Sequence, residues 1–457
     1  MMAIFFMLFC LTFAWWCVLW FAVGVDFAAL TTPAIVLLHV APPLLAVMLL
    51  VSARSAWKWK TAKRERERTA DIDRQEEAKR KAEDETKEAE IAKRRAFVEC
   101  RAAWLTVTDS PEWFTGELDQ SEIIVEDVDA LDDLHRETVL SLSLRKLFEM
   151  ALTQCKALAY LPLYLMYGHE DVAIAREVWQ EALTAAFPDD APTPDFRLFP
   201  DAAEPLTDRI IAMFENDPEM PAIWLIGMDS LLEGMTGSSA PEIKPGHAVA
   251  ALILSRPSLV LDESDTIEER EADPHRPFWE QEHGYRQAPQ WGSVPPAMRG
   301  VLLEMTPLTT LHRSRALNLQ EITRPIIMSQ RLHAVIQNAL IDAGLLDLPG
   351  GAETKEPEPL DLGFMVHNAG ADSDPITGQR LASVVAALND FECPMDVDLS
   401  ANVLAEHGDT GTACPTVMLA EAAISAAQAQ LPVMVAGWVG AQRLDIGFVL
   451  PSGWLEF

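Results

Sequence analysis

A histidine, an asparagine and two small residues occupy positions 367–370, where an apolar run over residues 360–366 ends. A helical pattern over residues 379–388 follows this loop. A buried strand that ends in a small-residue loop and feeds a helix is the layout in which α/β proteins place their sites. The imidazole of His367 could transfer a proton there. The interpretation we favour is that His367 satisfies a backbone group of the loop.

A second loop, residues 406–413, reads Glu-His-Gly-Asp-Thr-Gly-Thr-Ala and precedes an alanine-rich helical pattern over residues 416–430. Its ionisable side chains include His407 and Asp409. Together with His367, these two residues are the candidates for acid–base chemistry. The sequence supplies no partner that would assign any of the three a catalytic role, so we predict none.

The chain has no recognisable nucleophile, metal or cofactor motif. The six cysteines are scattered without metal-site or redox spacing, so we expect reduced thiols. Phosphate-binding glycine loops and the Gly-x-Ser-x-Gly elbow are missing from the sequence. His275 and His283 lie among acidic residues, but their spacing does not place both on one helix face. We therefore predict no metal and no cofactor.

The elements that would position these loops alternate between strands and helices. Apolar runs bounded by turn residues predict strands over residues 222–227, 248–254, 433–437 and 444–450. Amphipathic patterns predict helices over residues 206–214 and 329–344. We expect residues 102–190 to be mainly helical, over 140–167 and 171–186, with a kink or break at Pro162. The predicted fold class is α/β, with a mixed layered sheet covered by helices on both faces.

Residues 1–53 predict a membrane anchor of two helices. Asp26 is the first charged residue, and the next is Arg54, so two uncharged stretches each exceed the roughly 20 residues that cross a bilayer. We place the spans near residues 3–23 and 33–51. Basic residues crowd the chain from Arg54 onward, and the positive-inside rule puts that side in the cytoplasm. The expected location is the bacterial inner membrane, as a multi-pass protein with a cytoplasmic domain.

A charged helical stalk over residues 54–101 should follow, because good helix formers dominate and glycine and proline are missing there. Residues 102–457 should form the globular domain, with a first half over 102–257 and a second half over 258–457. The formal charge of the whole chain is −33, while basic residues outnumber acidic ones in the stalk. The globular part is therefore strongly acidic, which argues against nucleic acid as a partner and suits recognition of a protein.

Several segments resemble, in order, the fold of thiolases and β-ketoacyl synthases. Residues 222–232 are similar to the strand and small-residue turn that lie beyond the nucleophile helix in that family. Residues 244–254 resemble its Gly-Glu-Gly-Ala strand, with His247 at the Glu position. Residues 332–344 resemble a helix of the second half, and residues 436–450 resemble the closing hairpin. The resemblance covers about half of residues 200–457 and implies a thiolase-like fold.

The two candidate loops also resemble family motifs. Residues 367–370, with Asp374, are similar to the His-Gly-Thr-Gly-Thr…Asp motif, which puts His367 at the first catalytic histidine. Residues 408–413 resemble the Gly-His-Thr…Gly-Ala loop, but Asp409 stands where the family has its second histidine. The family's active cysteine should lie near residues 200–204, which contain no cysteine, and Cys155 comes too early. Without a thiolate to carry the acyl group, condensation cannot run.

The layout of a membrane anchor, an acidic surface and a thiolase-like domain without a nucleophile resembles the type VI secretion lipase-adaptor family. This resemblance implies a non-catalytic adaptor that hands a phospholipase effector to the secretion spike in the cytoplasm. Two alternatives stay open. One is an acyl-handling enzyme that uses His367 with Asp409 or His407, and the other is a structural subunit of a membrane complex.

Overall fold

The computed structural model describes most of the 457 residues, namely 2–22, 30–107, 121–125, 136–167, 172–187, 194–199, 203–217, 220–230, 243, 246–257, 259, 291, 294–319, 325–346, 361–371, 375–391, 393, 395, 399–440 and 442–454. His275, His283 and Asp374 lie outside the described residues. Two compact units, Met1–Glu90 and Ile91–Phe457, make up the chain.

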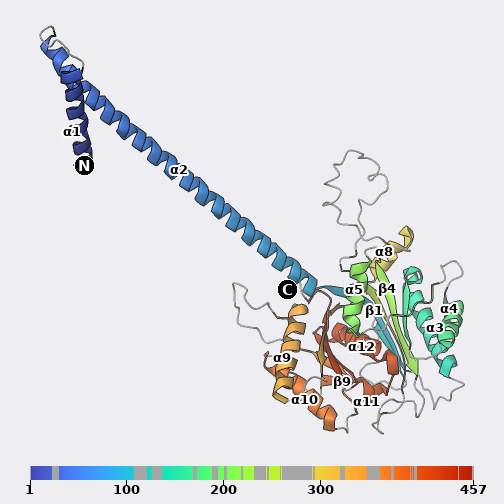
Figure 1. Cartoon of the computed structure of the whole chain (residues 1–457). Coiled ribbons are helices and arrows are strands. Elements are labelled where there is room, and N and C mark those ends of the chain that lie inside the picture. Colours follow the sequence, from blue (N-terminus) through green and yellow to red (C-terminus); the bar gives the residue numbers. More distant parts are fainter. Residues whose placement is uncertain are drawn as a thin grey trace. The chain divides into compact units, whose positions relative to one another are not determined.

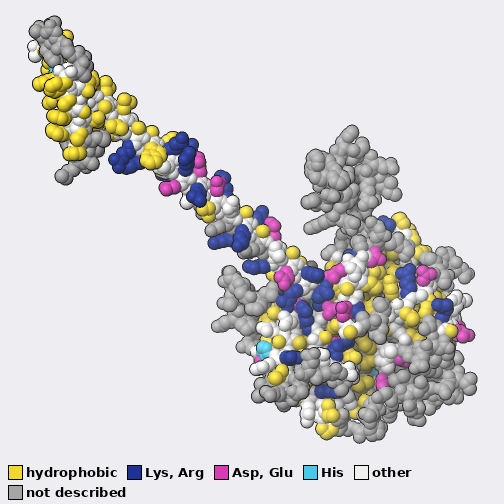
Figure 2. Space-filling view, viewed as in Figure 1, with side chains coloured by type: hydrophobic (Ala, Val, Ile, Leu, Met, Phe, Trp, Pro, Cys, Tyr) yellow, Lys and Arg dark blue, Asp and Glu magenta, His cyan; other side chains and the backbone are white. Residues whose placement is uncertain are grey.

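The first unit begins with two apolar helical segments. Helix α1 (Met2–Cys17) continues into a π-helical turn, η1 (Val18–Ala22), and α2 (Thr32–Arg94) follows. The indole N–H of Trp15 donates to the carbonyl of Leu38 at 2.9 Å, and that of Trp20 donates to His39 Nε2 at 3.1 Å. The first helix therefore packs beside the start of α2, and Figure 2 shows hydrophobic side chains gathered over both.

By length and composition, α2 is the one helix among the described residues that is apolar and long enough to cross a membrane. The expected span over residues 33–51 falls within it. The expected span over residues 3–23 falls on α1 and η1, which form a shorter apolar segment. The structure thus supports one membrane-spanning helix, and the expected two-span anchor is not established by it.

The expected helical stalk forms the later part of α2, where charged residues at i and i+4 face each other, as in Lys63–Glu67 at 3.8 Å. Both side chains are exposed, so such pairs contribute little to stability. The helix ends at Arg94 and strand β1 (Phe97–Val107) begins before the expected end of the stalk at Arg101.

The second unit, Ile91–Phe457, contains one sheet of eleven described strands. Its order is β3-β4-β5-β1-β6-β11-β10-β8-β9, with β2 beside β1 and β7 beside β11. The strands after β1 are β2 (Ser121–Val125), β3 (Leu163–Tyr167), β4 (Ala222–Ser230), β5 (His247–Ser255), β6 (Thr309–His312), β7 (Arg315–Asn318), β8 (Phe364–His367), β9 (Ser400–Asn402), β10 (Val433–Val439) and β11 (Arg443–Pro451).

The two halves of this sheet repeat the same arrangement. In the first half β3 pairs in parallel with β4, β4 forms an antiparallel hairpin with β5, and β5 pairs antiparallel with β1. In the second half β8, β10, β11 and β6 are related in the same way. The outer neighbours also correspond, since β9 lies parallel to β8 and Leu198 makes a parallel bridge to Leu165 of β3. The antiparallel pair β1–β6 joins the halves.

Helices cover both faces of the sheet, as Figure 1 shows, and the expected fold class is confirmed. One face packs against α5 (Leu206–Asn216) and α12 (Cys414–Ala429). On the other face α3 (Arg136–Gln154), α4 (Val172–Ala186) and α8 (Pro296–Glu304) cover the first half. On this same face α9 (Pro325–Asp342) and α10 (Pro375–Asn389) cover the second half. Short helices η4 (Lys156–Tyr160), α11 (Val403–His407) and η6 (Gly411–Ala413) complete the described set.

The expectation that residues 102–190 are mainly helical is wrong in three places. Strand β1 occupies residues up to Val107, residues 121–125 form β2, and residues 163–167, expected to continue a helix, form β3. Pro162, which lacks a backbone N–H, separates β3 from the preceding helical turn. The sequence Leu-Tyr-Leu-Met-Tyr then pairs along β4, where its two leucines are buried.

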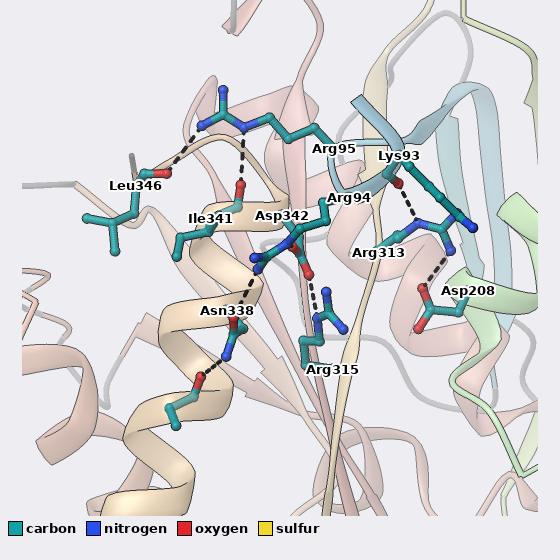
Figure 3. Close-up of polar contacts among 11 residues, drawn as sticks. Lys93, Arg94, Arg95, Asp208, Arg313, Arg315, Asn338, Ile341, Asp342 and Leu346 are labelled. Carbon is teal, nitrogen blue, oxygen red and sulfur yellow. Dashed lines mark hydrogen bonds and ion pairs between the residues drawn. The ribbon is translucent and has the colours of Figure 1, made fainter. Parts of the chain in front are cut away.

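A polar cluster fixes the point where the chain enters the sheet (Figure 3). The carboxylate of Asp342, fully buried, accepts hydrogen bonds from Arg94 at 2.8 Å and from Arg315. Arg94 also donates to the side-chain oxygen of Asn338 at 2.9 Å. Arg95 donates to the carbonyl of Ile341 at 3.3 Å, near the end of α9. Arg94 and Arg95 are thus part of the domain's polar framework.

Replacing Gly227 by Ala should lower the free energy of unfolding by about 1–3 kcal/mol, the usual cost of overpacking. A β-carbon at Gly227 of β4 would lie 2.6 Å from Thr416 Cβ of α12. Gly300 of α8 has nothing within 4 Å of that position, so Gly300→Ala should instead add about 0.5–1 kcal/mol. Urea unfolding of the full chain in detergent, followed by tryptophan fluorescence, measures both. Equal effects would contradict the close approach of β4 and α12.

Acid should destabilise the domain through His312, which is buried opposite Phe97 in the β1–β6 pair. Burial, aided by the nearby charge of Arg95, lowers the pKa of His312 from 6.5 to about 4. Between these values the unfolded chain binds more protons than the folded chain, so stability is present above pH 6.5 and falls as the pH drops. The loss should approach about 1.4 kcal/mol per pH unit. Denaturation midpoints of wild type and His312→Gln between pH 4.5 and 7 test this, and parallel pH profiles would contradict it.

Candidate functional site

A cavity of about 300 Å³ lies where the first turn of α5, the start of α12, the end of β10 and the start of β11 meet. Its walls are mostly apolar and include Leu206, Met418, Val435 and Trp438. Charged side chains at Glu204, Arg209, Arg443 and Asp445 also line it. Arg443 and Asp445 pair with each other at 2.8 Å, so this part of the wall is charge-balanced.

Asn368 organises the cavity wall. Its side-chain oxygen accepts a hydrogen bond from the backbone N–H of Trp438 at 2.6 Å. Its amide nitrogen donates to the carbonyl of Trp438 at 3.1 Å and lies 3.6 Å from the sulfur of Cys414. One side chain therefore ties the end of β8 to β10 and also contacts the thiol at the start of α12. Asn368 belongs to the first candidate loop, residues 367–370, but its sequence context alone predicts no role for it.

The thiol of Cys414 is the one nucleophile-type sulfur among the described residues that line the cavity. Burial raises its pKa to about 12, and the hydrogen bond from Asn368 opposes this shift only in part. Only the thiolate is a competent nucleophile, so the neutral thiol of Cys414 is unreactive near neutral pH. At the start of α5, the residues that line the cavity include Pro205 and Leu206, neither of which carries a nucleophile.

His367 lies at the end of β8 and is buried. Its Nδ1 accepts a hydrogen bond from the backbone N–H of Ala369 at 3.3 Å, and its ring stands edge-on to Trp438 at 6.5 Å. It is not among the residues that line the described cavity. These contacts are those of a histidine that orders its own loop.

Asp409 braces the second loop. Its side chain accepts a hydrogen bond from the N–H of Gly411 at 3.0 Å, and its carbonyl accepts one from Gly246 at 2.9 Å. The buried carboxylate of Asp229, at the end of β4, accepts from both the N–H and the hydroxyl of Thr412, at 2.9 and 3.0 Å. No local sequence pattern marks Asp229 as a member of this site, because its partner lies far along the chain.

His407 Nε2 lies 3.7 Å from a carboxylate oxygen of Glu421 in α12. The three candidates from the sequence thus have different described partners: a backbone group for His367, the loop itself for Asp409, and a buried glutamate for His407. The structure therefore presents an apolar cavity beside these loops, with a neutral thiol in its wall.

No protein-family model and no curated protein matches this chain. Among solved structures it is similar to the peroxisomal 3-ketoacyl-CoA thiolase of Saccharomyces cerevisiae, at 11% identity and a TM-score of 0.43 over 78% of this chain and 98% of that one. It is also similar to ChlB3, an acyltransferase, at 13% identity and a TM-score of 0.42 over 78% and 98% of the two chains. Cerulenin-bound OleA of Xanthomonas campestris has 13% identity and a TM-score of 0.37 over 78% and 96%. These similarities do not assign the chain to a family.

Alkylation should distinguish a buried neutral thiol from an activated one. At pH 8 a thiol with a pKa near 12 has about 1000-fold less thiolate than an ordinary thiol. Cys414 in the folded chain should therefore react with iodoacetamide at least about 1000-fold more slowly than in the urea-unfolded chain. Peptide mass spectrometry measures the rate at each cysteine. Fast labelling of Cys414 in the folded protein would show that it is an activated nucleophile.

Proposed function

We propose that this protein is a membrane-anchored, non-catalytic adaptor on a thiolase-like domain. Its partner is a protein, a secreted phospholipase effector of a type VI secretion system, which it delivers to the secretion spike. Residues 1–53 lie in the bacterial inner membrane as a hairpin, and the domain lies in the cytoplasm. The contacts of Trp15 and Trp20 with the start of α2, and the basic residues that follow Arg54, support this placement.

The observation that carries the proposal is the apolar cavity with a neutral thiol in its wall. Nucleophilic acyl transfer needs a thiolate or an activated hydroxyl beside a base. The polar groups of Asn368 are instead engaged by Trp438, and burial keeps Cys414 protonated. A pocket of this size and character is suited to an apolar side chain of a partner, an anchor of the kind that carries much of the affinity of protein interfaces.

The partner's approach is through the rim at Val439, which lines the cavity and is 48% exposed. If Val439 were replaced by Glu, the new carboxylate would have to be desolvated when the partner covers the cavity. The described rim already carries paired charges, as in Arg443 with Asp445, which would fix the orientation of the partner more than its affinity.

Val439→Glu should reduce recovery of the partner by at least about tenfold, equivalent to about 1.4 kcal/mol of binding free energy. The tagged full chain is purified in mild detergent from the native bacterium, and retained proteins are identified by mass spectrometry. Wild type and His367→Ala should retain a phospholipase effector or a spike protein. Leu142→Glu is the matched control, because Leu142 is 55% exposed on α3 and does not line the described cavity.

Two results would contradict the adaptor. The first is retention of acyl carrier protein in place of an effector, with binding lost in His367→Ala. The second is acyl transfer from a coenzyme A ester by the purified chain, abolished by substitution of His367 or Asp409. Either result would favour the acyl-handling enzyme.

A further inference from the structure

Three side chains of the types that bind metal ions lie close together at a place that does not line the cavity. Glu406 and His407 are the last two residues of α11, and Glu421 lies in the middle of α12. One potential ligand atom from each lies within 4.8 Å of the other two. None of these three residues lines the cavity described above.

Glu421 is the unusual member of this cluster. Its side chain is fully buried in a helix whose neighbouring residues, Ala420 and Ala422, belong to the hydrophobic core. Both of its carboxylate oxygens are buried, and neither accepts a hydrogen bond within the described part of the chain. Its ion-pair partner, His407 Nε2, is 3.7 Å away, which is beyond normal hydrogen-bonding distance. A carboxylate in such a place is unfavourable unless a positive charge compensates it closely.

The cluster holds two carboxylates and one imidazole. An imidazolium on His407 would compensate one carboxylate, but Glu406 supplies a second. One carboxylate oxygen of Glu406 accepts a hydrogen bond from the backbone N–H of Asn402 at 3.3 Å, at the start of α11. A divalent cation bound to a neutral imidazole would compensate both carboxylates together.

The donor set selects the kind of cation. Imidazole nitrogen with carboxylate oxygen suits zinc and other first-row divalent metals, whereas calcium and magnesium prefer oxygen ligands throughout. Ligands held at about 2.0–2.2 Å from one ion lie up to about 4 Å apart, so the observed separations require side-chain shifts of about 1 Å. Glu406 is only partly buried, which leaves a route from solvent and an open fourth position for water.

We propose that Glu406, His407 and Glu421 form a binding site for a divalent first-row metal ion such as Zn²⁺. The ion links the end of α11 to the middle of α12 and so clamps both ends of the intervening loop, residues 408–413. This loop carries Gly411 of the cavity wall and leads directly into Cys414. The proposal does not rest on the adaptor function, because it concerns a different set of residues.

Zinc titration of the full chain in detergent, after removal of metals with a chelator, tests the site. Calorimetry with elemental analysis should give about one tightly bound ion per wild-type chain. Glu421→Gln should weaken binding by at least about 100-fold, since even outer-shell partners of a metal typically account for 10–100-fold. His333→Gln is the matched control, because His333 lies on α9 against Phe391, away from the cluster's helices. Cobalt substitution should give a spectrum without the thiolate charge-transfer band, which excludes binding by cysteine.

Thermal unfolding keeps the test independent of folding failure. Zinc should raise the Tm of wild type and of His333→Gln but not that of Glu421→Gln. Without metal, Glu421→Gln should unfold at the same temperature as wild type or higher, because it removes a buried charge. Equal zinc binding by wild type and Glu421→Gln would overturn the proposal. The absence of zinc binding by wild type would also overturn it, whatever the Tm of the variant.

Discussion

The antiparallel pairing of β1 with β6 is the interaction on which the rest of the domain depends. It joins two halves that otherwise share no described strand pairing in the sheet, and β1 is also the inner neighbour of β5. The residues of β1 that pair with β6 are Phe97 to Cys100, directly after the last turn of α2. Because Arg94 compensates the buried carboxylate of Asp342, the end of the helix is fixed by the same framework as the strand. A chain that began at residue 102 would lose this seam.

The repeated arrangement of the halves explains why α12 is so closely packed. It lies with α5 on the face of the sheet that both halves share, and almost every residue from Cys414 to Ala426 is buried. A helix surrounded in this way needs small residues where a neighbouring strand approaches closely, either on the helix or on the strand. Gly227 faces Thr416 for this reason. The alanine-rich composition of α12 therefore reflects its central position, and Cys414 and Glu421 are its ionisable side chains.

Sequence patterns located those elements whose burial is uniform. Strands β4, β5, β10 and β11 are continuous apolar runs bounded by turn residues, and they were predicted close to their observed bounds. Strand β1 was missed because Glu99 and Arg101 look like a continuation of the stalk. In the folded domain Arg101 is buried, paired with Glu99 at 2.8 Å and bonded to Ser255 at 2.7 Å. A paired charge inside the sheet has no local signature. The same limit applies to the site: loops 367–370 and 406–413 could be singled out, but the roles of their members depend on distant partners, as His407 does on Glu421.

These partners also determine how the two functional regions relate. Cys414, in the cavity wall, and Glu421 are about two turns apart on α12. Between the helix and α11, loop 408–413 is held by Asp229 at Thr412 and by Gly246 at Asp409. Gly246 itself lies so close to the carbonyl of His407 that a β-carbon would be 2.4 Å from it. With so little room, the loop cannot shift at one end without moving the other. A ligand that repositions His407 would therefore act on a closely packed loop that leads into the cavity wall at Gly411 and Cys414, even though the two sites share no lining residue.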